Sequence, residues 1–385
     1  MSIIRNSNVY LENRGIVKTS LRIENGVIRE ISDEIEGSNA ITFPEKQILV
    51  PGFIDEHTHG ADGCDAMDAS GESIHTIAKA ILEEGTTSLL FTTMTMEKKR
   101  ILSSLSTIRE YLSIQDQMVA NGLGIHLEGP FISPAFCGAQ NKEDILELSV
   151  DDLNDFIRES GDNIKVMTFS YKAGHDDFIK TAHDHHIVLS LGHTDDTYQQ
   201  AKEAFDKGVR LTTHTYNAMR GFHHREAGTV GALFMDDRVS CELILDLHHV
   251  CRESAQVLIK MKGKDHIILI TDSMEAKYLK DGQYELGGNP VYVKDGTARL
   301  KDGTLAGSIL KMNDAIRNAK DVFSLSLTEA VDLATINPAR NLHVDNMIGS
   351  IALGKRADFA LIDENINVYK TFRNGVCVYN KKENR

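Results

Sequence analysis

The chain has 385 residues, a formal net charge of −14, 41% hydrophobic residues and 25% charged residues. These values are typical of a globular protein, and no apolar run approaches the roughly 20 residues that a membrane helix needs. Because an acidic surface repels phosphate backbones and anionic lipids, we expect neither nucleic acid nor a membrane as a partner. The five scattered cysteines and a beginning without a signal-peptide core predict a cytoplasmic protein with reduced thiols.

Both ends of the chain are predicted to be β structure. Asn25-Gly26 separates two short runs of alternating polarity, a pattern typical of a type I′ hairpin. Near the C-terminus, Arg373-Asn374-Gly375 separates two further runs of the same kind. We therefore expect one small β-sandwich domain formed by both termini, from residues 1–50 and 344–385.

The middle of the chain, residues 51–343, alternates short apolar runs with amphipathic stretches such as residues 98–112. The runs are rich in aliphatic and β-branched residues, as strands buried on both faces should be. They are residues 48–54, 87–91, 123–127, 164–169, 187–191, 209–213, 241–245 and 267–270. Eight β/α units predict an α/β fold, a (β/α)8 TIM barrel that forms the catalytic domain. An open doubly wound sheet is the alternative, which the absence of a GxGxxG after the first strand disfavours.

One segment interrupts this alternation after the eighth strand. Asp295-Gly296 and Asp302-Gly303 are turn signals that follow short β-like runs. They predict a β-hairpin insertion over about residues 275–305. Since it follows a strand end, it could act as a lid over the mouth of the barrel.

Metal-binding side chains stand at the ends of four predicted strands. His57 and His59 follow the first, Glu128 the third, and His193 and His214 the fifth and sixth. Singly, each would be read as an ordinary loop carboxylate or hydrogen-bonded histidine. Because the carboxyl ends of barrel strands converge at one mouth, together they predict a site for one or two divalent ions, with zinc or iron favoured.

Further polar residues at the same mouth could take part in the chemistry. Asp272 ends the eighth strand and could carry a proton beside a metal-activated water or serve as another ligand, which indicates metal-assisted hydrolysis. Arg225 and His249 could meet an anionic group, and Gln140 could donate to a carbonyl oxygen. An ordinary loop residue is the alternative for Arg225 and for Gln140. His126 is a weaker candidate that could simply belong to the core.

Several segments resemble one known family. The chain is similar to the N-acetylglucosamine-6-phosphate deacetylases, of the amidohydrolase superfamily, and the matching stretches span nearly the whole chain. The segments most specific to this family are His126-Leu127-Glu128-Gly129-Pro130-Phe131, Tyr216-Asn217-Ala218-Met219 and Leu305-Ala306-Gly307-Ser308.

The resemblance implies hydrolysis of the acetamide of N-acetylglucosamine 6-phosphate to glucosamine 6-phosphate and acetate. It implies that Glu128, His193 and His214 hold the main ion and that His57 and His59 could hold a second. It also implies contacts with the phosphorylated amino sugar from seven residues, with Arg225 reaching across a homodimer and Gln140 standing where some members carry histidine. These seven are Gln140, Asn217, Ala218, Arg225, His249, Ala306 and Gly307.

The sequence is compatible with three other functions. An N-acetylgalactosamine-6-phosphate deacetylase would present the same groups to an epimeric sugar. A cyclic-amide hydrolase would normally carry a bridging lysine at the end of the fourth strand, whereas Lys165 stands at its start. A non-catalytic sugar-sensing relative would have no need of Asp272 beside a complete ligand set.

Overall fold

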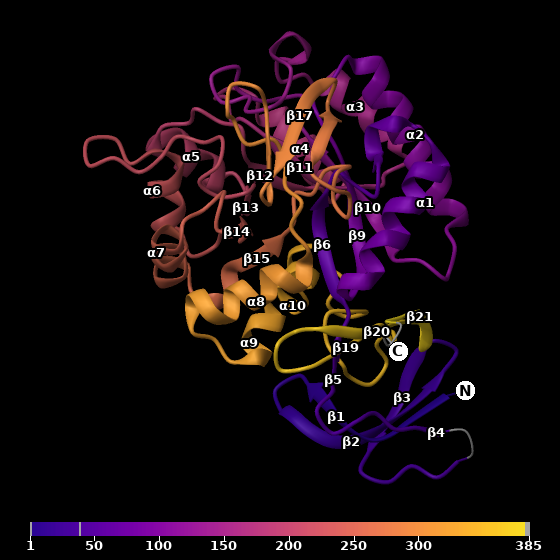
Figure 1. The fold of residues 1–385 in the computed structure, drawn as a ribbon. Coiled ribbons are helices and arrows are strands. Elements are labelled where there is room, and N and C mark those ends of the chain that lie inside the picture. Colours follow the sequence, from indigo (N-terminus) through magenta and orange to yellow (C-terminus); the bar gives the residue numbers. More distant parts are fainter. Residues whose placement is uncertain (1, 38–39, 382–385) are drawn as a thin grey trace.

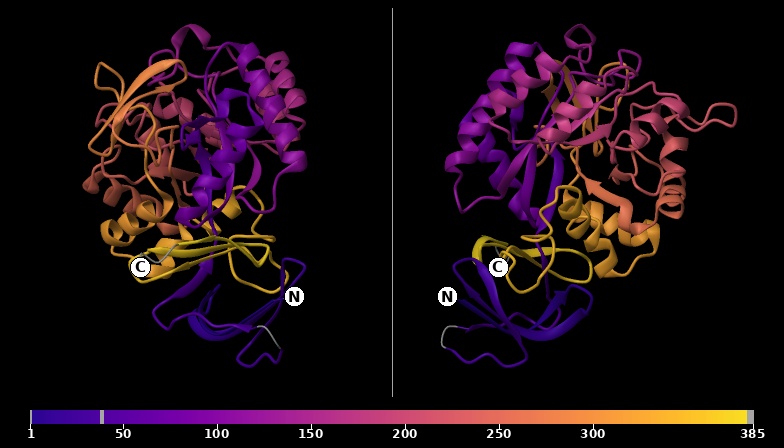
Figure 2. Two further views of the ribbon diagram at one scale, coloured as in Figure 1. Left: turned by 45° about the vertical axis from the view of Figure 1, so that its right-hand side comes forward. Right: turned by 180° about the vertical axis from the view of Figure 1, so that it is seen from behind.

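The structure, a computed structural model, describes residues 2–37 and 40–381. It places a barrel of strands and helices above a smaller set of terminal strands (Figure 1). Two further views show the same arrangement, with the terminal strands at one end of the barrel and an insertion at the other (Figure 2). The positions 1, 38–39 and 382–385 of the predicted terminal domain lie outside the described residues.

Eight parallel strands form the barrel wall, so the predicted (β/α)8 fold is confirmed. Adjacent strands pair in sequence order around the wall. The strands are β6 (Phe53–Thr58), β9 (Thr86–Thr93), β10 (Asn121–Glu128), β11 (Ile164–Phe169), β12 (Val188–Leu191), β13 (Leu211–Thr212), β14 (Ser240–Ile244) and β15 (Ile267–Ile270). Nearly every strand residue is buried, as expected for a sheet covered on both faces.

One helix follows each barrel strand and packs outside it. These helices are α1 (Gly71–Ala80), α2 (Lys98–Ile114), α3 (Val150–Ser160), α4 (Asp176–Asp184), α5 (Tyr198–Asp206), α6 (Gly228–Phe234), α7 (Arg252–Lys262) and α8 (Met312–Phe323). Two short helices, α9 (Leu327–Asp332) and α10 (Ile336–Asn341), complete the barrel domain. Across the described ranges, no helix is both long enough and apolar enough to cross a membrane.

Polar contacts close the barrel between its first and last strands. The backbone N–H of Asp272 donates to the carbonyl oxygen of His57 at 2.9 Å, and Thr58 forms a parallel bridge with Ser273. The buried carboxylate of Asp55 accepts a hydrogen bond from the Thr271 hydroxyl at 2.5 Å. These contacts bring the ends of β6 and β15 together, and with them the predicted site residues that follow both strands.

The run predicted as one barrel strand, residues 48–54, is in fact two strands. β5 (Ile48–Pro51) pairs with terminal strands, and only β6 belongs to the barrel. The chain crosses between the two sheets at Gly52, where a Cβ atom would lie 2.2 Å from the Thr87 hydroxyl oxygen. A continuous apolar run cannot reveal this crossing, because both strands are equally buried.

The terminal strands form one mixed sheet of eight strands. Its order is β21-β20-β19-β5-β1-β2-β3, with β4 paired to β1. Their bounds are β1 (Ser2–Leu11), β2 (Gly15–Glu24), β3 (Val27–Ser32), β4 (Ala40–Ile41), β19 (Phe359–Ile362), β20 (Val368–Arg373) and β21 (Val376–Asn380). Residues from both ends of the chain, including Leu21, Leu49 and Phe359, pack into a second apolar core. We propose that these strands are a separate domain with the predicted boundaries.

The predicted hairpin turns occur at both ends of this sheet. Asn25 and Gly26 have φ values of 52° and 77° between β2 and β3. Positive φ at both positions defines a type I′ turn, which asparagine and glycine tolerate best. The turn at Asn374-Gly375 packs against the first one, because a Cβ on Gly26 would lie 2.9 Å from Cβ of Asn374. The sheet therefore folds back on itself.

The segment after β15 contains a small antiparallel sheet. Its strands are β16 (Gly282–Leu286), β17 (Asn289–Lys294) and β18 (Thr297–Arg299). Asn289 donates to the carbonyl oxygen of Ala139 at 3.0 Å, so the insertion contacts the loop after β10. Figure 1 shows β17 above the barrel, at the end opposite the terminal sheet.

A buried ion pair anchors the start of this insertion. The Lys277 ammonium lies 2.8 Å from the Glu84 carboxylate, and both side chains are fully buried. Glu84 also accepts hydrogen bonds from the Tyr278 hydroxyl and from the backbone N–H of Met312, each at 3.1 Å. Burial raises the pKa of Glu84, and Lys277 opposes this rise. Removing the ammonium would thus leave an uncompensated carboxylate in the core.

We predict that Lys277→Met lowers the free energy of unfolding by about 3–5 kcal/mol, the usual cost of breaking a buried pair from one side. Chemical denaturation measures this change. Lys180→Ala is the matched control, because it removes an exposed i,i+4 pair with Asp184 and should leave the unfolding midpoint where it is. Equal midpoints for the wild type and Lys277→Met would contradict the structural role of the pair.

Candidate metal centre

The carboxylate of Glu128 is the centre of the candidate site. Its Oε1 lies 3.2 Å from Nε2 of His193 and 3.1 Å from Nε2 of His214. The two imidazole nitrogens are themselves 3.1 Å apart. All three side chains are almost completely buried. One carboxylate oxygen and two imidazole nitrogens thus converge on one point.

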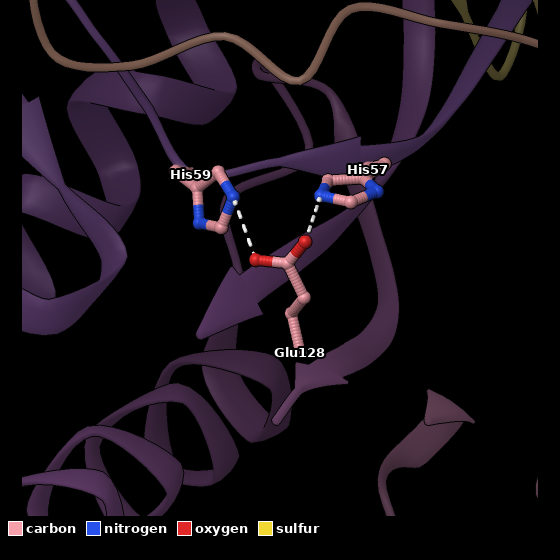
Figure 3. Close-up of side chains that lie close together, drawn as sticks. All are labelled: His57, His59 and Glu128. Carbon is pink, nitrogen blue, oxygen red and sulfur yellow. Dashed lines mark ion pairs between the residues drawn. The ribbon is translucent and has the colours of Figure 1, made fainter. Parts of the chain in front are cut away.

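The His57 and His59 rings approach the same carboxylate from a different strand. Nε2 of His57 lies 3.5 Å from Oε1 of Glu128, and Nε2 of His59 lies 3.4 Å from Oε2. Figure 3 shows the two rings above the carboxylate, one facing each oxygen. Glu128 therefore stands between two pairs of histidines, as a carboxylate shared by two ions would.

The barrel explains why these residues meet. His57 lies in β6 and Glu128 ends β10, while His193, His214 and Asp272 follow β12, β13 and β15. Three of these residues have left-handed backbones, with φ of 47° at His193, 30° at His214 and 48° at Asp272. Non-glycine residues adopt this region at an energetic cost, which is found most often at functional sites.

The donor set fits a divalent ion. Nε2 of His57 is buried without a hydrogen-bond partner, although it faces carboxylate oxygens of Glu128 and Asp272 at 3.5 Å. Imidazole nitrogens and carboxylate oxygens in this number are the ligands that zinc and iron prefer. All four histidines and Glu128 also fall into groups compact enough to hold an ion, as His57, His59 and Glu128 and as Glu128, His193 and His214.

Electrostatics in the cluster favour ionised carboxylates. Burial raises the pKa of Asp272, but His57 and His59 outweigh it and lower the pKa to about 2. Burial likewise raises the pKa of Glu128, and His193, His214 and His57 hold it well below its usual range. Burial lowers the pKa of His57, whereas Glu242, Asp272 and Glu128 raise it to about 9. Positive charge is therefore required here, and a bound cation could supply it in place of protons.

Asp272 and Gln140 contact the histidine and glutamate cluster and also line the neighbouring cavity. Oδ1 of Asp272 lies 3.2 Å from Nε2 of His59. The Gln140 amide donates to Oε2 of Glu128 at 2.8 Å, and its oxygen accepts from the backbone N–H of Thr95 at 2.9 Å. Both residues line a cavity of about 400 Å3, a size suited to small-molecule sites.

The cavity brings together most, but not all, of the predicted substrate residues. Asn217, Ala218, His249 and Gly307 line it together with Gln140. Gly307 has φ of 61°, and a Cβ there would lie 3.2 Å from the carbonyl oxygen of Asp272, so only glycine fits this close approach. Ala306 is fully buried beside it and lies outside the lining.

Arg225 lies away from the cavity of its own chain. It is exposed in the loop before α6, where its guanidinium contacts the His224 ring at 2.8 Å. In the described part of the chain, the residues that line the cavity include no lysine or arginine. Within one chain, the predicted phosphate contact of Arg225 is therefore not formed.

Two residues of the site were not predicted from the sequence. Glu242 lies inside β14, and its carboxylate is 3.0 Å from Nδ1 of His57. Oδ1 of Asp55 in β6 accepts hydrogen bonds from the backbone N–H of His57 at 3.3 Å and of Thr271 at 3.2 Å. The available signal was a carboxylate within an otherwise apolar strand, because such groups are buried only when they are paired.

His126 and Lys165, the two other residues considered from the sequence, are held by hydrogen bonds to the protein itself. Both ring nitrogens of His126 are hydrogen-bonded, to the Glu56 carbonyl oxygen at 3.1 Å and the Thr168 hydroxyl at 2.7 Å. Lys165 lies at the start of β11 and contacts the Asp162 carbonyl oxygen at 3.3 Å. Lys165 is therefore at the wrong end of its strand to bridge ions, which argues against a cyclic-amide hydrolase.

The fold and the convergent ligand set define a hydrolase barrel, and comparison with known proteins gives its family. The profile of the Amidohydrolase family matches residues 48–378. The chain belongs to this family.

More specific relatives match nearly the whole chain. An N-acetylglucosamine-6-phosphate deacetylase of Bacillus subtilis (strain 168) is 38% identical over 99% of this chain and 98% of its own length. An N-acetylgalactosamine-6-phosphate deacetylase of Escherichia coli O157:H7 is 35% identical over 97% and 98%. The crystal structure of the N-acetylglucosamine-6-phosphate deacetylase of Thermotoga maritima is 32% identical, with a TM-score of 0.89 over 98% of this chain and 100% of that one.

We predict that Glu128→Ala, His193→Ala and His214→Ala each lose a bound ion, because each removes one of three convergent ligands. Elemental analysis of the purified proteins after dialysis measures the loss. His126→Ala is the control, since this ring is hydrogen-bonded into the core. Full metal content in all three ligand variants would show that the ion binds elsewhere.

Proposed function

We propose that the protein is a metal-dependent deacetylase that hydrolyses N-acetylglucosamine 6-phosphate to glucosamine 6-phosphate and acetate. The observation that carries this proposal is the set of four histidines around Glu128, with ionised Asp272 between them and the cavity. Near full-length similarity to deacetylases of this substrate supports the choice of the amide. The family and this similarity disfavour a non-catalytic sugar-sensing relative.

The reaction adds water to the acetyl carbonyl carbon and breaks the carbon–nitrogen bond. A bound divalent ion polarises a carbonyl and makes water acidic, which is its usual contribution to such reactions. Asp272 accepts the proton of the attacking water, because its depressed pKa keeps it ionised. The same carboxyl group then gives that proton to the sugar nitrogen, which leaves as an amine only when protonated.

The remaining cavity residues position the sugar. His249 is oriented by a hydrogen bond from Nδ1 to the Asp246 carboxylate at 2.7 Å, so its other nitrogen is free for the substrate. The Asn217 amide donates to the His214 carbonyl oxygen at 3.1 Å. Ala218 and Gly307 supply backbone groups at the cavity wall, and the buried Ala306 supports Gly307 from behind it. The Gln140 amide, already beside Glu128, could contact the acetamide oxygen.

The phosphate requires a cation that the cavity of one chain lacks. We propose that Arg225 supplies it to the neighbouring subunit of a homodimer. In support, Phe222 in the same loop is 64% exposed and Met235 after α6 is 72% exposed. Exposed apolar side chains on either side of α6 are typical of an association surface. A cytoplasmic location, with all five cysteines free, is part of the same proposal.

The galactosamine epimer is a second candidate substrate. The relative that acts on it is 35% identical, close to the 38% of the glucosamine enzyme. We place the glucosamine epimer first on this similarity, so assays should include both sugars.

We predict that the metal-loaded protein releases acetate from N-acetylglucosamine 6-phosphate and that chelator-treated protein does not.

Asp272→Asn keeps the shape of the side chain but cannot carry a proton, so kcat should fall by about 10²–10⁴-fold. Acetate release, metal content and binding of a non-hydrolysed analogue are measured on the same samples. No acetate from any metal-loaded sample would refute the deacetylase, whereas near-normal kcat in Asp272→Asn would remove only this residue from the mechanism.

We predict that Arg225→Ala raises KM for the phosphorylated sugar about 10–100-fold, because charge-assisted hydrogen bonds to a phosphate are lost. KM for unphosphorylated N-acetylglucosamine should change little. Mixing Arg225→Ala with Asp272→Asn subunits should then restore activity, since each hybrid dimer has one site with both residues. A hybrid without activity would show that Arg225 does not act across the interface.

A further inference from the structure

Glu242 is a buried carboxylate that the proposed reaction does not use. It occupies the third position of β14, and its side chain is fully buried between the apolar residues Cys241 and Leu243. A carboxylate in such a place is costly unless nearby groups donate hydrogen bonds to it. Its partners therefore indicate what it does.

The partner that matters most is the His57 ring. Oε2 of Glu242 lies 3.0 Å from Nδ1 of His57. A His57 ring that binds an ion through Nε2 must carry its one hydrogen on Nδ1, where the carboxylate oxygen of Glu242 accepts it. Its lone pair is then on Nε2, the atom that faces Glu128 and Asp272 at 3.5 Å without a hydrogen-bond partner.

Glu242 also contacts the strand end that carries His214. Its Oε2 accepts from the backbone N–H of His214 at 3.2 Å, and its carbonyl oxygen accepts from Thr215 at 2.9 Å. The carbonyl contact with this segment survives any change of the side chain, whereas the side chain is the only part of Glu242 that contacts the His57 ring. Substitution of Glu242 should therefore affect His57 far more than His214.

Neighbouring groups do not duplicate this role. Nδ1 of His126 is 3.9 Å from Oε1 of Glu242, too far for a hydrogen bond, and donates or accepts elsewhere. Glu56, equally buried and adjacent to His57 in β6, contacts the Asn341 amide at 3.0 and 3.1 Å. Glu56 thus offers a matched control for loss of a buried carboxylate.

We propose that Glu242 is the positioning residue of the His57/His59 half of the metal centre. It holds the His57 ring in the tautomer and direction that present Nε2 to an ion. The proposal rests on the proposed function, because that function requires the ion. It adds a residue outside the ligand set that decides how strongly one of two ions binds.

The test uses Co2+ titration of the full-length protein after removal of bound metal. Visible absorption reports the coordination of each ion, and elemental analysis reports the number retained. Glu242→Gln replaces the charged acceptor of the His57 hydrogen by a neutral amide oxygen, so we expect it to weaken one of two ions by about 10–100-fold, the usual effect of changing the partner of a ligand histidine. Glu56→Gln should bind both ions as the wild type does.

A double-mutant comparison decides whether Glu242 acts through His57. In the His57→Ala background, the ion that remains should bind equally well with Glu242 and with Gln at this position. The proposal is wrong if Glu242→Gln binds Co2+ as the wild type does, if it weakens the ion that His57→Ala retains, or if His57→Ala retains no ion. Acetate release by the metal-loaded wild type is measured separately, so failure of the proposed function is distinguishable from failure of this role.

Discussion

The burial of the Glu128 carboxylate among imidazole rings is the constraint on which the rest of the site depends. A barrel interior normally excludes charge, because an ion that leaves water for an apolar environment loses its solvation. Here Glu128 and Asp272 remain ionised with depressed pKa values, so positive charge must stand beside them. Protonated histidines supply this positive charge when no ion is bound. A divalent ion that displaces their protons would supply it instead.

The barrel meets this constraint by its geometry. Parallel strands end at one mouth, so one or two residues from each of five strands reach one point without long loops. The contacts of Asp55 and Asp272 with the facing strands hold β6 against β15, and this closure sets the distance between the His57 pair and Asp272. The terminal sheet and the insertion then lie at opposite ends of the barrel, as Figure 1 shows.

Much of this arrangement was predictable, because strand order and ligand spacing are local in the sequence. Apolar runs identified the strands, and the residues after them identified the mouth. The division of residues 48–54 into β5 and β6 was not predictable, since it depends on pairing with β19, more than 300 residues later. Glu242 was missed for a related reason, because only the folded barrel brings its carboxylate to the His57 ring. The role of Arg225 could not be located within one chain, because the proposed phosphate contact is made in the site of the neighbouring subunit.

The central claim is that an ion binds between Glu128 and the histidines that surround it. Anomalous diffraction from crystals grown with zinc tests it most directly. The account predicts a peak at about 2.0–2.2 Å from a Glu128 oxygen and from Nε2 of both His193 and His214. Crystals whose anomalous peaks all lie elsewhere, with the Glu128 carboxylate bonded only to protein, would contradict it.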